Sequence, residues 1–337
     1  MDPNETAAGP DRALLLAVRD LVTRIPVEGG GAVHAVNGIS FSIAREESLA
    51  LVGECGSGTS MSVLSLLGLL PPPGRVTQGT AVFEGRDLLT LSQGELRKIR
   101  GPRIGMVFQD PSTSLNPVLN IGQQLSEGLR EHAGMTGAAR RARAIELLGL
   151  VGIPDAQARL ASYPHEFSGG QRQRILIAMA IACEPSLLIA DEPTTALDVT
   201  IQAQIVELLK DLQKRLGMAI LWITHDLALV AGLVDRVAVM YAGSIVEQAP
   251  VRDLFKRPRH PYTVGLLKAM PHDRARHEGQ QRLLAIPGAP PDLREEFPGC
   301  AFAPRCPLRI ERCFVERPPL VSIAPGHESA CFRAEKL

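Results

Sequence analysis

The sequence predicts an α/β fold, and three of its features lead to that prediction. A short apolar run at residues 48–52 ends at a glycine-rich loop, and a helix-like apolar pattern follows the loop. A second apolar run at residues 187–190 ends at two adjacent carboxylates, Asp191 and Glu192. Strand-like and helix-like segments alternate between and after these runs. Because open parallel sheets bind ligands at the carboxyl ends of their strands, both run ends are candidate ligand positions.

The chain before the loop is predicted to form an antiparallel edge sheet. Apolar and polar residues alternate at residues 14–22 and again at residues 33–43. Such alternation is typical of strands with one buried face. We therefore expect two strands ahead of the glycine-rich loop.

The glycine-rich loop at residues 53–60, hereafter the glycine loop, reads GECGSGTS. Its glycines let the backbone curl so that successive amide N–H groups point at phosphate oxygens. The helix that follows directs its positive end at the same phosphates. The residues that we assign to nucleotide binding in this loop are Gly53, Glu54, Cys55, Gly56, Ser57, Gly58, Thr59 and Ser60.

The glycine loop departs from the usual phosphate-binding pattern at Thr59. The pattern has a lysine at this position, and that lysine contacts the β- and γ-phosphates. Threonine cannot supply the charge, whereas Ser60 keeps the hydroxyl that ligates magnesium in such loops. Taken alone, the loop is equally consistent with an ordinary strand-to-helix turn.

Residues 112–183 are predicted to be largely helical, because apolar residues recur at helical spacing around residues 145–151. Gln109 lies just before this region, and Phe167 opens the sequence FSGGQ within it. A hydroxyl and backbone amides at a helix start suit an anion, although Ser-Gly-Gly is also common in turns. The polar members of FSGGQ are Ser168, Gly169, Gly170 and Gln171.

Two adjacent carboxylates are candidates for nucleotide hydrolysis, and a histidine follows a later predicted strand. Asp191 is placed to hold magnesium through water, and Glu192 to polarise an attacking water. The alternative is a strand followed by a solvated acidic turn. His225 follows a predicted strand at residues 219–224, and a histidine that only caps this strand is the alternative there. The apolar face at residues 201–216 is interpreted as helix packing.

The order glycine loop, Gln109, FSGGQ, DEPTTALD and His225 resembles the ATP-binding cassette (ABC) family over roughly residues 10–250. The resemblance implies a cassette with an antiparallel β subdomain and a helical subdomain at about residues 112–183. It implies ATP and magnesium as ligands, with Ser60, Gln109 and Asp191 holding the metal, Asp191 through water. Cassettes usually stack adenine on an aromatic residue, but residues 18–36 contain none, so His34 and Ile25 are the candidates for that contact.

The resemblance also implies a role for each remaining motif. Gln109 senses magnesium and the attacking water, Glu192 and His225 act in catalysis, and His225 contacts the γ-phosphate. The signature, residues 168–171, completes the site of a partner cassette, and Asp198 lies in the loop that crosses the dimer interface. Since the chain has one glycine loop and one signature, a single copy has to dimerise to function.

After about Pro250 the sequence changes character, because proline, arginine and cysteine rise and regular periodicity fades. We predict an ATP-binding domain at residues 1–255 and a small Cys-rich extension at residues 256–337. Four of the six cysteines lie in this extension, with the spacing C-x5-C-x6-C-x17-C. They are Cys300, Cys306, Cys313 and Cys331.

The spacing of these cysteines leaves the type of ligand open. In a reducing compartment a metal or cluster explains four clustered cysteines better than disulfides do. Zinc is the usual metal for four thiolates, but its sites tend to have close C-x2-4-C pairs that this spacing lacks. Free thiols in a weakly packed tail are the third alternative.

Residues 285–293 and 298–307 resemble the carboxyl-terminal extension of ATPases from oligopeptide, dipeptide and nickel importers. Residues 109–117, 163–171 and 189–208 resemble the first of the two different ATPase subunits in such importers. The resemblance implies a structural iron–sulfur cluster on the four cysteines. It also implies a second ATPase subunit, two membrane permease subunits and, indirectly, an extracytoplasmic solute-binding protein as partners.

The expected function is an ATPase subunit that energises uptake of peptides or of a related small solute such as nickel. Thr59 predicts that the chain's own glycine loop is weakened, while its signature serves the partner's site. The alternative is a nucleotide-binding regulatory subunit without hydrolysis. Cassette ATPases of translation or DNA repair would have two cassettes or a long coiled coil, and the sequence has neither. The sequence does not identify the transported solute.

Composition limits the other classes of function. The 337 residues are 45% hydrophobic, yet no run approaches the roughly 18 apolar residues of a membrane helix. The first residues, MDPNETAAG, are acidic and polar, unlike a secretory signal. We therefore expect a peripheral protein at the cytoplasmic face of the membrane. With 36 basic and 36 acidic residues and no basic stripe, nucleic acid is not an expected partner.

Overall fold

The computed structural model describes residues 12–195, 197–270 and 285–337. The chain divides into two compact units, which are described separately. The glycine-loop unit comprises Met1–Ala44, Ser48–Leu89 and Thr224–Leu337, and the helical unit comprises Arg45–Glu47 and Thr90–Ile223. The acidic amino-terminal segment, residues 1–9, lies outside the described residues.

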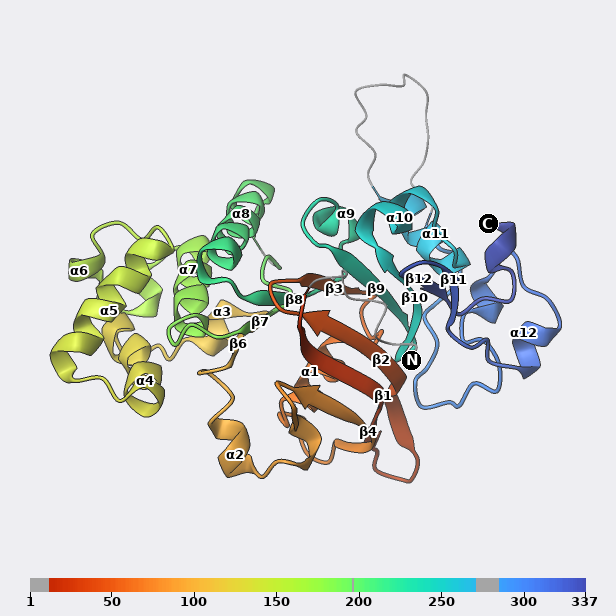
Figure 1. Ribbon diagram of the computed structural model, residues 1–337, viewed down its shortest axis with the longest axis horizontal. Helices are drawn as coiled ribbons and strands as arrows, with labels where there is room; N and C mark the ends of the chain where they lie inside the picture. The colour runs from red at the N-terminus through yellow and green to blue at the C-terminus, as the bar shows by residue number, and fades with distance from the viewer. Residues whose placement is uncertain (1–11, 196, 271–284) are drawn as a thin grey trace, which may run out of the picture. The chain divides into compact units, whose positions relative to one another are not determined.

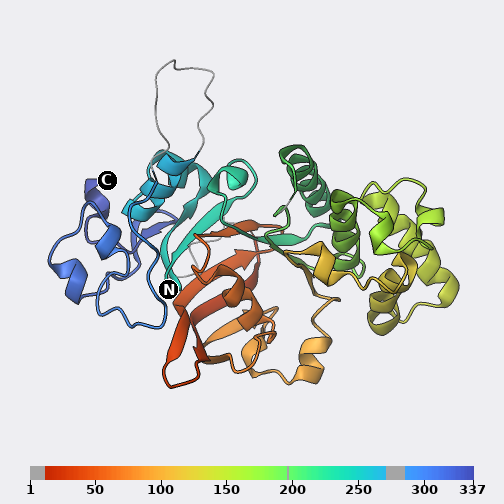
Figure 2. The same cartoon turned by 180° about the vertical axis from the view of Figure 1, so that it is seen from behind.

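The glycine-loop unit begins with an antiparallel sheet in the order β2-β1-β4-β5. Its first two strands pair over nearly their whole length, so the two predicted edge strands are confirmed. Helix α1 packs against β1, β2 and β4, as the orange helix and red sheet of Figure 2 show. The elements are β1 (Leu14–Pro26), β2 (Ala32–Ala44), α1 (Thr59–Leu66), β4 (Arg75–Phe83) and β5 (Arg86–Asp87).

A second set of strands in this unit includes β3, which leads directly into the glycine loop. The strands follow the order β11-β12-β10-β9-β3, in which β3 and β9 are parallel and the others antiparallel. All five residues of β3 are buried, which explains the uninterrupted apolar run in the sequence. The strands are β3 (Ser48–Val52), β9 (Arg236–Tyr241), β10 (Ser244–Pro250), β11 (Val321–Ala324) and β12 (His327–Ser329).

The extension joins this unit by strand pairing. Strands β11 and β12 come from the extension, and β12 pairs with β10, as Figure 1 shows in blue and cyan. The predicted boundary between residues 255 and 256 falls inside α10, one residue before its end. The helices around this sheet are α9 (Leu227–Val230), α10 (Val251–Lys256), α11 (Pro261–Ala269), η4 (Ala303–Arg305), α12 (Arg312–Val315) and η5 (Ala334–Lys336).

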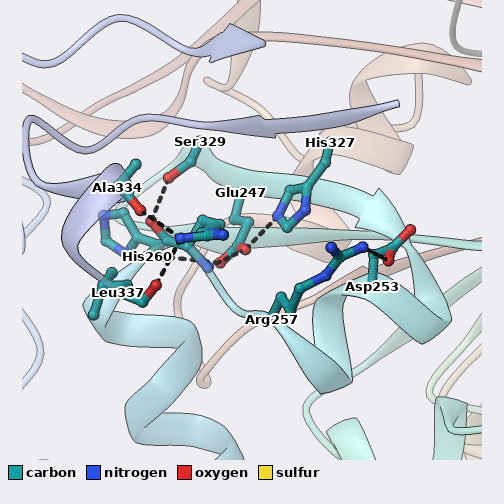
Figure 3. Close-up of polar contacts among 9 residues, drawn as sticks. Glu247, Asp253, Arg257, His260, His327, Ser329, Ala334 and Leu337 are labelled. Carbon is teal, nitrogen blue, oxygen red and sulfur yellow. Dashed lines mark hydrogen bonds and ion pairs between the residues drawn. The ribbon is translucent and has the colours of Figure 1, made fainter. Parts of the chain in front are cut away.

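A buried carboxylate, Glu247 of β10, fixes the extension in place (Figure 3). It accepts hydrogen bonds from the main-chain N–H groups of Arg259 and His260, at 2.6 and 2.9 Å. The ring of His327 in β12 lies 2.8 Å away through Nε2. Arg259 in turn donates to the main-chain O of Leu337 at 2.6 Å. The carboxylate therefore ties β10, the start of α11 and β12 together.

The helical unit has a parallel sheet of three strands in the order β8-β7-β6. Residues 112–183 are largely helical, as predicted, and α4 and α5 pack together and against α7 (Figure 1). The strands are β6 (Ile104–Val107), β7 (Leu187–Asp191) and β8 (Ala219–Thr224). The helices are α2 (Gln93–Arg97), α3 (Pro111–Ser114), α4 (Ile121–Ala133), α5 (Gly137–Leu150), α6 (Ala156–Arg159), η2 (Pro164–Glu166), α7 (Gly169–Ala180) and α8 (Val199–Leu216). A short turn, η1 (Leu88–Thr90), lies at the junction of the two units in the chain.

Helix α8 starts two residues earlier than the apolar pattern indicates. The predicted helix covers residues 201–216, whereas the observed helix is Val199–Leu216. Asp198 caps it, since its side chain accepts a hydrogen bond from the Ile201 N–H. Ile205, Leu209 and Leu212 of α8 are buried, which agrees with the interpretation of its apolar face as packing.

Within the described part of the chain, no helix is both long and apolar enough to cross a membrane.

Candidate functional site

The glycine loop connects the end of β3 to the start of α1. Gly56 and Gly58 have positive φ angles of 82° and 98°, which glycine adopts without strain. A Cβ atom on Gly58 would lie 2.3 Å from the main-chain O of Ala35, so no larger residue fits there without a backbone shift. The sequence thus folds into a tight curl that ends at the amino terminus of an eight-residue helix.

Ser57 holds the centre of this curl. Its N–H donates to the Glu54 carbonyl at 2.9 Å, and its own carbonyl accepts from the Gly243 N–H at 2.8 Å. Its hydroxyl is buried and has no hydrogen-bond partner among the described residues. That oxygen lies 2.5 Å from where a Cβ on Gly53 would stand, so Gly53 is also required. The loop is therefore built as a compact turn before any ligand enters.

The loop fits a phosphate group, and its donor set lacks a cation at the expected position. Thr59 is the first residue of α1 and is partly exposed. Ser60 follows it with a hydroxyl, an oxygen ligand that magnesium accepts. The positive end of α1 and the main-chain amides supply the attraction for phosphate. The assignment of His34 or Ile25 to the contact with adenine stays a prediction.

His34 is tied to the extension. Its N–H donates to the Leu293 carbonyl at 2.7 Å, and its Nε2 lies 3.7 Å from Oε1 of Glu296. Ile25 pairs with Val33 at the end of the β1–β2 hairpin. The region in which an adenine contact is expected therefore borders the extension.

In the helical unit, Glu192 lies immediately beyond β7 in an uncommon backbone conformation. Its φ is 46°, in the left-handed region that non-glycine residues rarely adopt. Its N–H donates to the Ile223 carbonyl of β8 at 2.9 Å, which holds the turn in place. Asp191, the last residue of β7, is 93% buried. Such strained residues cluster at functional sites, where the surrounding structure enforces them.

The carboxylate of Glu192 is held by two donors. Gln109 Nε2 donates to Oε2 at 2.7 Å, and Thr195 Oγ1 donates to the same oxygen at 2.8 Å. The structure thus brings together two residues that the sequence assigns to catalysis. Thr195 was not among the predicted site residues. Its position three residues after Glu192 in DEPTTALD is the signal that could have identified it.

The signature residues cap helix α7. Ser168 Oγ accepts from the Gln171 N–H at 3.3 Å, and the Ser168 N–H donates to Gln171 Oε1 at 3.1 Å. This reciprocal pair is a capping box. A Cβ on Gly170 would lie 2.7 Å from Cγ2 of Ile201, so α7 and α8 approach closely there. Ser168 and Gly169 are exposed, which leaves this helix start accessible to a ligand or partner.

Asp198 lies at the start of the neighbouring helix. Its Oδ1 accepts from the Ile201 N–H at 3.0 Å, and the next residue, Val199, is 81% exposed. The two predicted contributors to a partner's site therefore lie at the amino termini of two packed helices. His225 is an exposed residue directly after β8 in the chain, and Asp226 caps α9 behind it.

The cysteines of the extension do not support the expected iron–sulfur cluster. The described residues contain no group of three or more His, Cys, Asp or Glu side chains placed to hold a metal ion. Burial raises the pKa of Cys300 to about 11 and also raises the pKa values of Cys306 and Cys331. Because the described residues contain no such group, the structure does not support the cluster, and no step below depends on one.

Comparison with protein families gives two matches. Residues 36–195 match the ABC transporter family model. Residues 246–313 match the model described as oligopeptide/dipeptide transporter, C-terminal region. The second match covers most of β10, the helices α10, α11 and η4, and three of the four cysteines of the extension.

Several curated proteins are similar over nearly their whole length. A probable peptide ABC transporter ATP-binding protein of Sinorhizobium fredii is 51% identical over 98% of each chain. The oligopeptide transport ATP-binding protein OppD of Bacillus subtilis is 51% identical over 93% of this chain and 87% of its own. The dipeptide transport ATP-binding protein DppD of the same organism is 51% identical over 90% of each chain.

Solved structures resemble the chain in fold. A dimeric ATP-binding cassette in a post-hydrolysis state, bound to ADP and Pi, is 28% identical with a TM-score of 0.63. The match covers 71% of this chain and 99% of that one. CbiO1 of Clostridium perfringens, part of an ABC transporter complex, is 30% identical with a TM-score of 0.62, over 73% of this chain and 92% of its own.

Proposed function

The chain belongs to the ATP-binding subunits of the ABC transporter family, and on that premise we propose that it binds ATP and drives the uptake of peptides. The observation that carries the proposal is the glycine loop, whose glycines at 53, 56 and 58 form a curl that fits phosphate. The peptide class rests on the relatives, which are named as peptide, oligopeptide and dipeptide transport proteins. A related small solute such as nickel stays within the proposal.

The residues proposed to hold magnesium are Ser60, Gln109 and Asp191. Their donors are a hydroxyl, an amide oxygen and a carboxylate, which are the oxygen ligands that magnesium prefers. When bound, magnesium neutralises charge on the β- and γ-phosphate oxygens. The amides of the glycine loop bind and orient the same phosphates. The remaining residues of the glycine loop, Glu54 and Cys55 among them, shape its curl.

Glu192 is proposed to polarise the attacking water. The hydrogen bonds from Gln109 and Thr195 fix the position of its carboxylate. Gln109 is also the residue through which we expect this carboxylate to respond to bound magnesium. His225 is proposed to contact the γ-phosphate.

Thr59 makes the two sites of a dimer unequal in this proposal. The chain pairs with a different cassette, and its own glycine loop lacks a charge that contacts the transferring phosphoryl group. A single such donor is worth on the order of 3 kcal/mol in other enzymes. The partner's loop together with residues 168–171 and Asp198 of this chain then forms the faster site.

The proposed assembly places residues 1–255 as the ATPase domain and residues 256–337 as the extension. Two membrane permease subunits and a second ATPase subunit complete the importer, and an extracytoplasmic solute-binding protein delivers the cargo. The chain would lie at the cytoplasmic face of the membrane, bound peripherally. Closing and opening of the ATPase dimer would pass motion to the permeases near residues 109–117.

The test is ATP hydrolysis by the complete importer, in which the parent is compared with Thr59→Lys and Glu192→Gln. Glu184→Gln is the matched control, because Glu184 is an exposed glutamate with φ 51° in the same unit. The proposal expects Glu192→Gln to change turnover little, as the partner's site does most of the work. If Glu192→Gln abolishes turnover while Glu184→Gln does not, the sites are equivalent and the asymmetric mechanism is wrong.

A regulatory subunit without hydrolysis is the second candidate, and Thr59 is the observation that favours it. This candidate predicts a silent importer even though nucleotide binds. If Thr59→Lys then restores turnover, the chain is a disabled ATPase. If the parent already hydrolyses ATP and Ser168→Ala stops it, the regulatory candidate is excluded.

A further inference from the structure

The second residue of the glycine loop, Glu54, is held by the extension through an ion pair. Arg305 directs two guanidinium nitrogens at its carboxylate, with Nη1 2.7 Å from Oε2 and Nη2 3.1 Å from Oε1. The side chain of Arg305 is only 6% exposed, and that of Glu54 is 27% exposed. A two-point, largely desolvated contact fixes both the position and the orientation of the carboxylate.

Arg305 is itself immobilised by its surroundings. Its Nε donates to the Pro287 carbonyl at 3.0 Å, and its Nη1 donates to the hydroxyl of Tyr241 at 3.3 Å. Its guanidinium also lies 5.8 and 5.9 Å from the ring centroids of Tyr241 and Phe302. An arginine held on several sides loses little further freedom when it binds Glu54, so the ion pair anchors the loop firmly.

A second contact from the extension reaches the main chain of Glu54. The Glu54 N–H donates to the hydroxyl of Tyr262 at 3.0 Å. Tyr262 belongs to α11, is fully buried, and packs its ring against those of Tyr241 and Phe302. Side chain and main chain of one loop residue are therefore held by two separate segments of the extension.

Glu54 is hydrogen-bonded in turn to Ser57, at the centre of the glycine loop. The carbonyl of Glu54 accepts the N–H of Ser57, which closes the turn of the glycine loop. Fixing Glu54 therefore fixes the turn whose amides face the phosphate position. Because Thr59 offers no charge, this chain depends more on the arrangement of those amides than a loop with lysine would.

We propose that Arg305 and Tyr262 are positioning residues through which the extension holds the glycine loop in its phosphate-binding conformation. Nucleotide binding then stabilises the docked extension in return, because coupling between two sites is reciprocal. A loop arranged in advance binds its ligand more tightly, since less freedom is lost on binding. The inference rests on the proposed function, as it assumes that the loop binds nucleotide.

The first test is amide hydrogen exchange on the full chain without nucleotide, using Arg305→Met and Glu54→Gln. The Ser57 amide is the reporter, because its hydrogen bond to Glu54 closes the turn. We expect its exchange to become about tenfold faster in both variants, as for the loss of one charge-assisted hydrogen bond. Unchanged exchange in both would overturn the inference.

The matched control is Arg312→Met. Arg312 forms a comparable two-point pair with Glu316 in the same extension, with contacts of 2.7 and 2.6 Å, but that pair is exposed. Its loss should leave the Ser57 amide unchanged. If Arg312→Met accelerates Ser57 exchange as much as Arg305→Met does, the effect is a general loosening of the extension and the inference is wrong.

The second test is the affinity of the same chains for a fluorescent ATP analogue with magnesium. We expect Arg305→Met and Glu54→Gln each to bind about tenfold more weakly, and the double variant no more weakly than either, because both remove the same contact. If the parent binds and Arg305→Met binds equally well, the inference fails and the proposed function stands.

The two tests separate the failure of the inference from the failure of the proposed function. If no chain binds nucleotide, Thr59→Lys included, the proposed function fails, and the exchange of the Ser57 amide still decides whether the extension positions the loop. If Arg305→Met does not fold, Glu54→Gln and Tyr262→Phe replace it, since they remove one contact each and leave the buried rings in place.

Discussion

Gln109 and Glu192, which are 83 residues apart in the chain, share a hydrogen bond of 2.7 Å. The same oxygen, Oε2 of Glu192, also accepts a hydrogen bond from the hydroxyl of Thr195 at 2.8 Å. The carboxylate proposed to activate water is therefore already oriented by two residues. Gln109 precedes the helical residues 112–183, and Thr195 follows β7, the strand that ends just before Glu192. This arrangement makes Thr195 a positioning residue for Glu192.

Removing the hydroxyl of Thr195 is expected to slow hydrolysis. In a Thr59→Lys background, Thr195→Val should lower the single-turnover rate of ATP cleavage about tenfold, because one hydrogen bond to a charged group is lost. Thr195→Ser keeps the hydroxyl and should retain the rate. Equal rates for the valine and serine variants would show that this hydrogen bond does not position the carboxylate.

The signature serine is expected to act in both folding and turnover. Ser168→Ala removes the cap of α7 and should lower the free energy of unfolding by about 1 kcal/mol. Thr136→Ala removes the cap of α5 at a similar cost. Only Ser168→Ala should also reduce ATP turnover of the importer, by roughly 100-fold. Equal turnover in the two variants would limit Ser168 to a structural role.

Glycines of the glycine loop are expected to differ in their tolerance of alanine. Gly58→Ala meets both a positive φ and the Ala35 carbonyl, so it should cost more than about 2 kcal/mol of stability. Gly56→Ala meets only the positive φ and should cost about 1 kcal/mol. A Cβ on Gly128 of α4 would meet no neighbouring atom, so Gly128→Ala should raise the free energy of unfolding by roughly 0.5–1 kcal/mol. Urea unfolding of the three variants checks this order.

Stability is expected to fall with acidification through His260. Burial lowers the pKa of His260 from 6.5 to about 3, so between these values the unfolded chain binds a proton that the folded chain does not. The stability that depends on a neutral His260 is therefore fully present above about pH 6.5 and declines as the pH falls towards 3. At pH 5 the titration of His260 should lower the free energy of unfolding by about 2 kcal/mol.

The control for this prediction is His260→Asn. The Nδ1 atom of His260 accepts the Tyr262 N–H at the start of α11, and asparagine can cap a helix in the same way without titrating. The difference in urea midpoint between pH 7 and pH 5 should shrink in this variant. If both proteins lose the same stability, His260 is not the group that titrates.

Cys300 is expected to react slowly with thiol reagents. Burial, followed by the neighbouring cysteines, raises its pKa from 9.0 to about 11, so its thiolate fraction at pH 8 falls about a hundredfold. Alkylation followed by mass spectrometry should label the exposed Cys55 well before Cys300. In urea the two should react alike. Rapid labelling of Cys300 in the folded protein would contradict the buried environment described here.

Much of the fold follows from local patterns. The buried strand β3 matches the apolar run at residues 48–52, and the predicted strand at residues 219–224 has the bounds of β8. The antiparallel pair β1–β2 follows from alternation. Such patterns are reliable because burial of one or both faces of an element imposes its period on the sequence. The start of α8 was missed by two residues, since its cap, Asp198, is polar and lies outside the apolar period.

The sequence by itself determined the family, the glycine loop, the signature and the order of these motifs, because each is a local pattern that a short stretch of chain reveals. Only the tertiary structure decided that Arg305 holds Glu54 across 251 residues and that Gln109 meets Glu192. It also showed that the four cysteines of the extension are not arranged as a metal site among the described residues. The physical reason is the same in each case. A contact between distant residues depends on how the intervening chain closes, which local periodicity does not record.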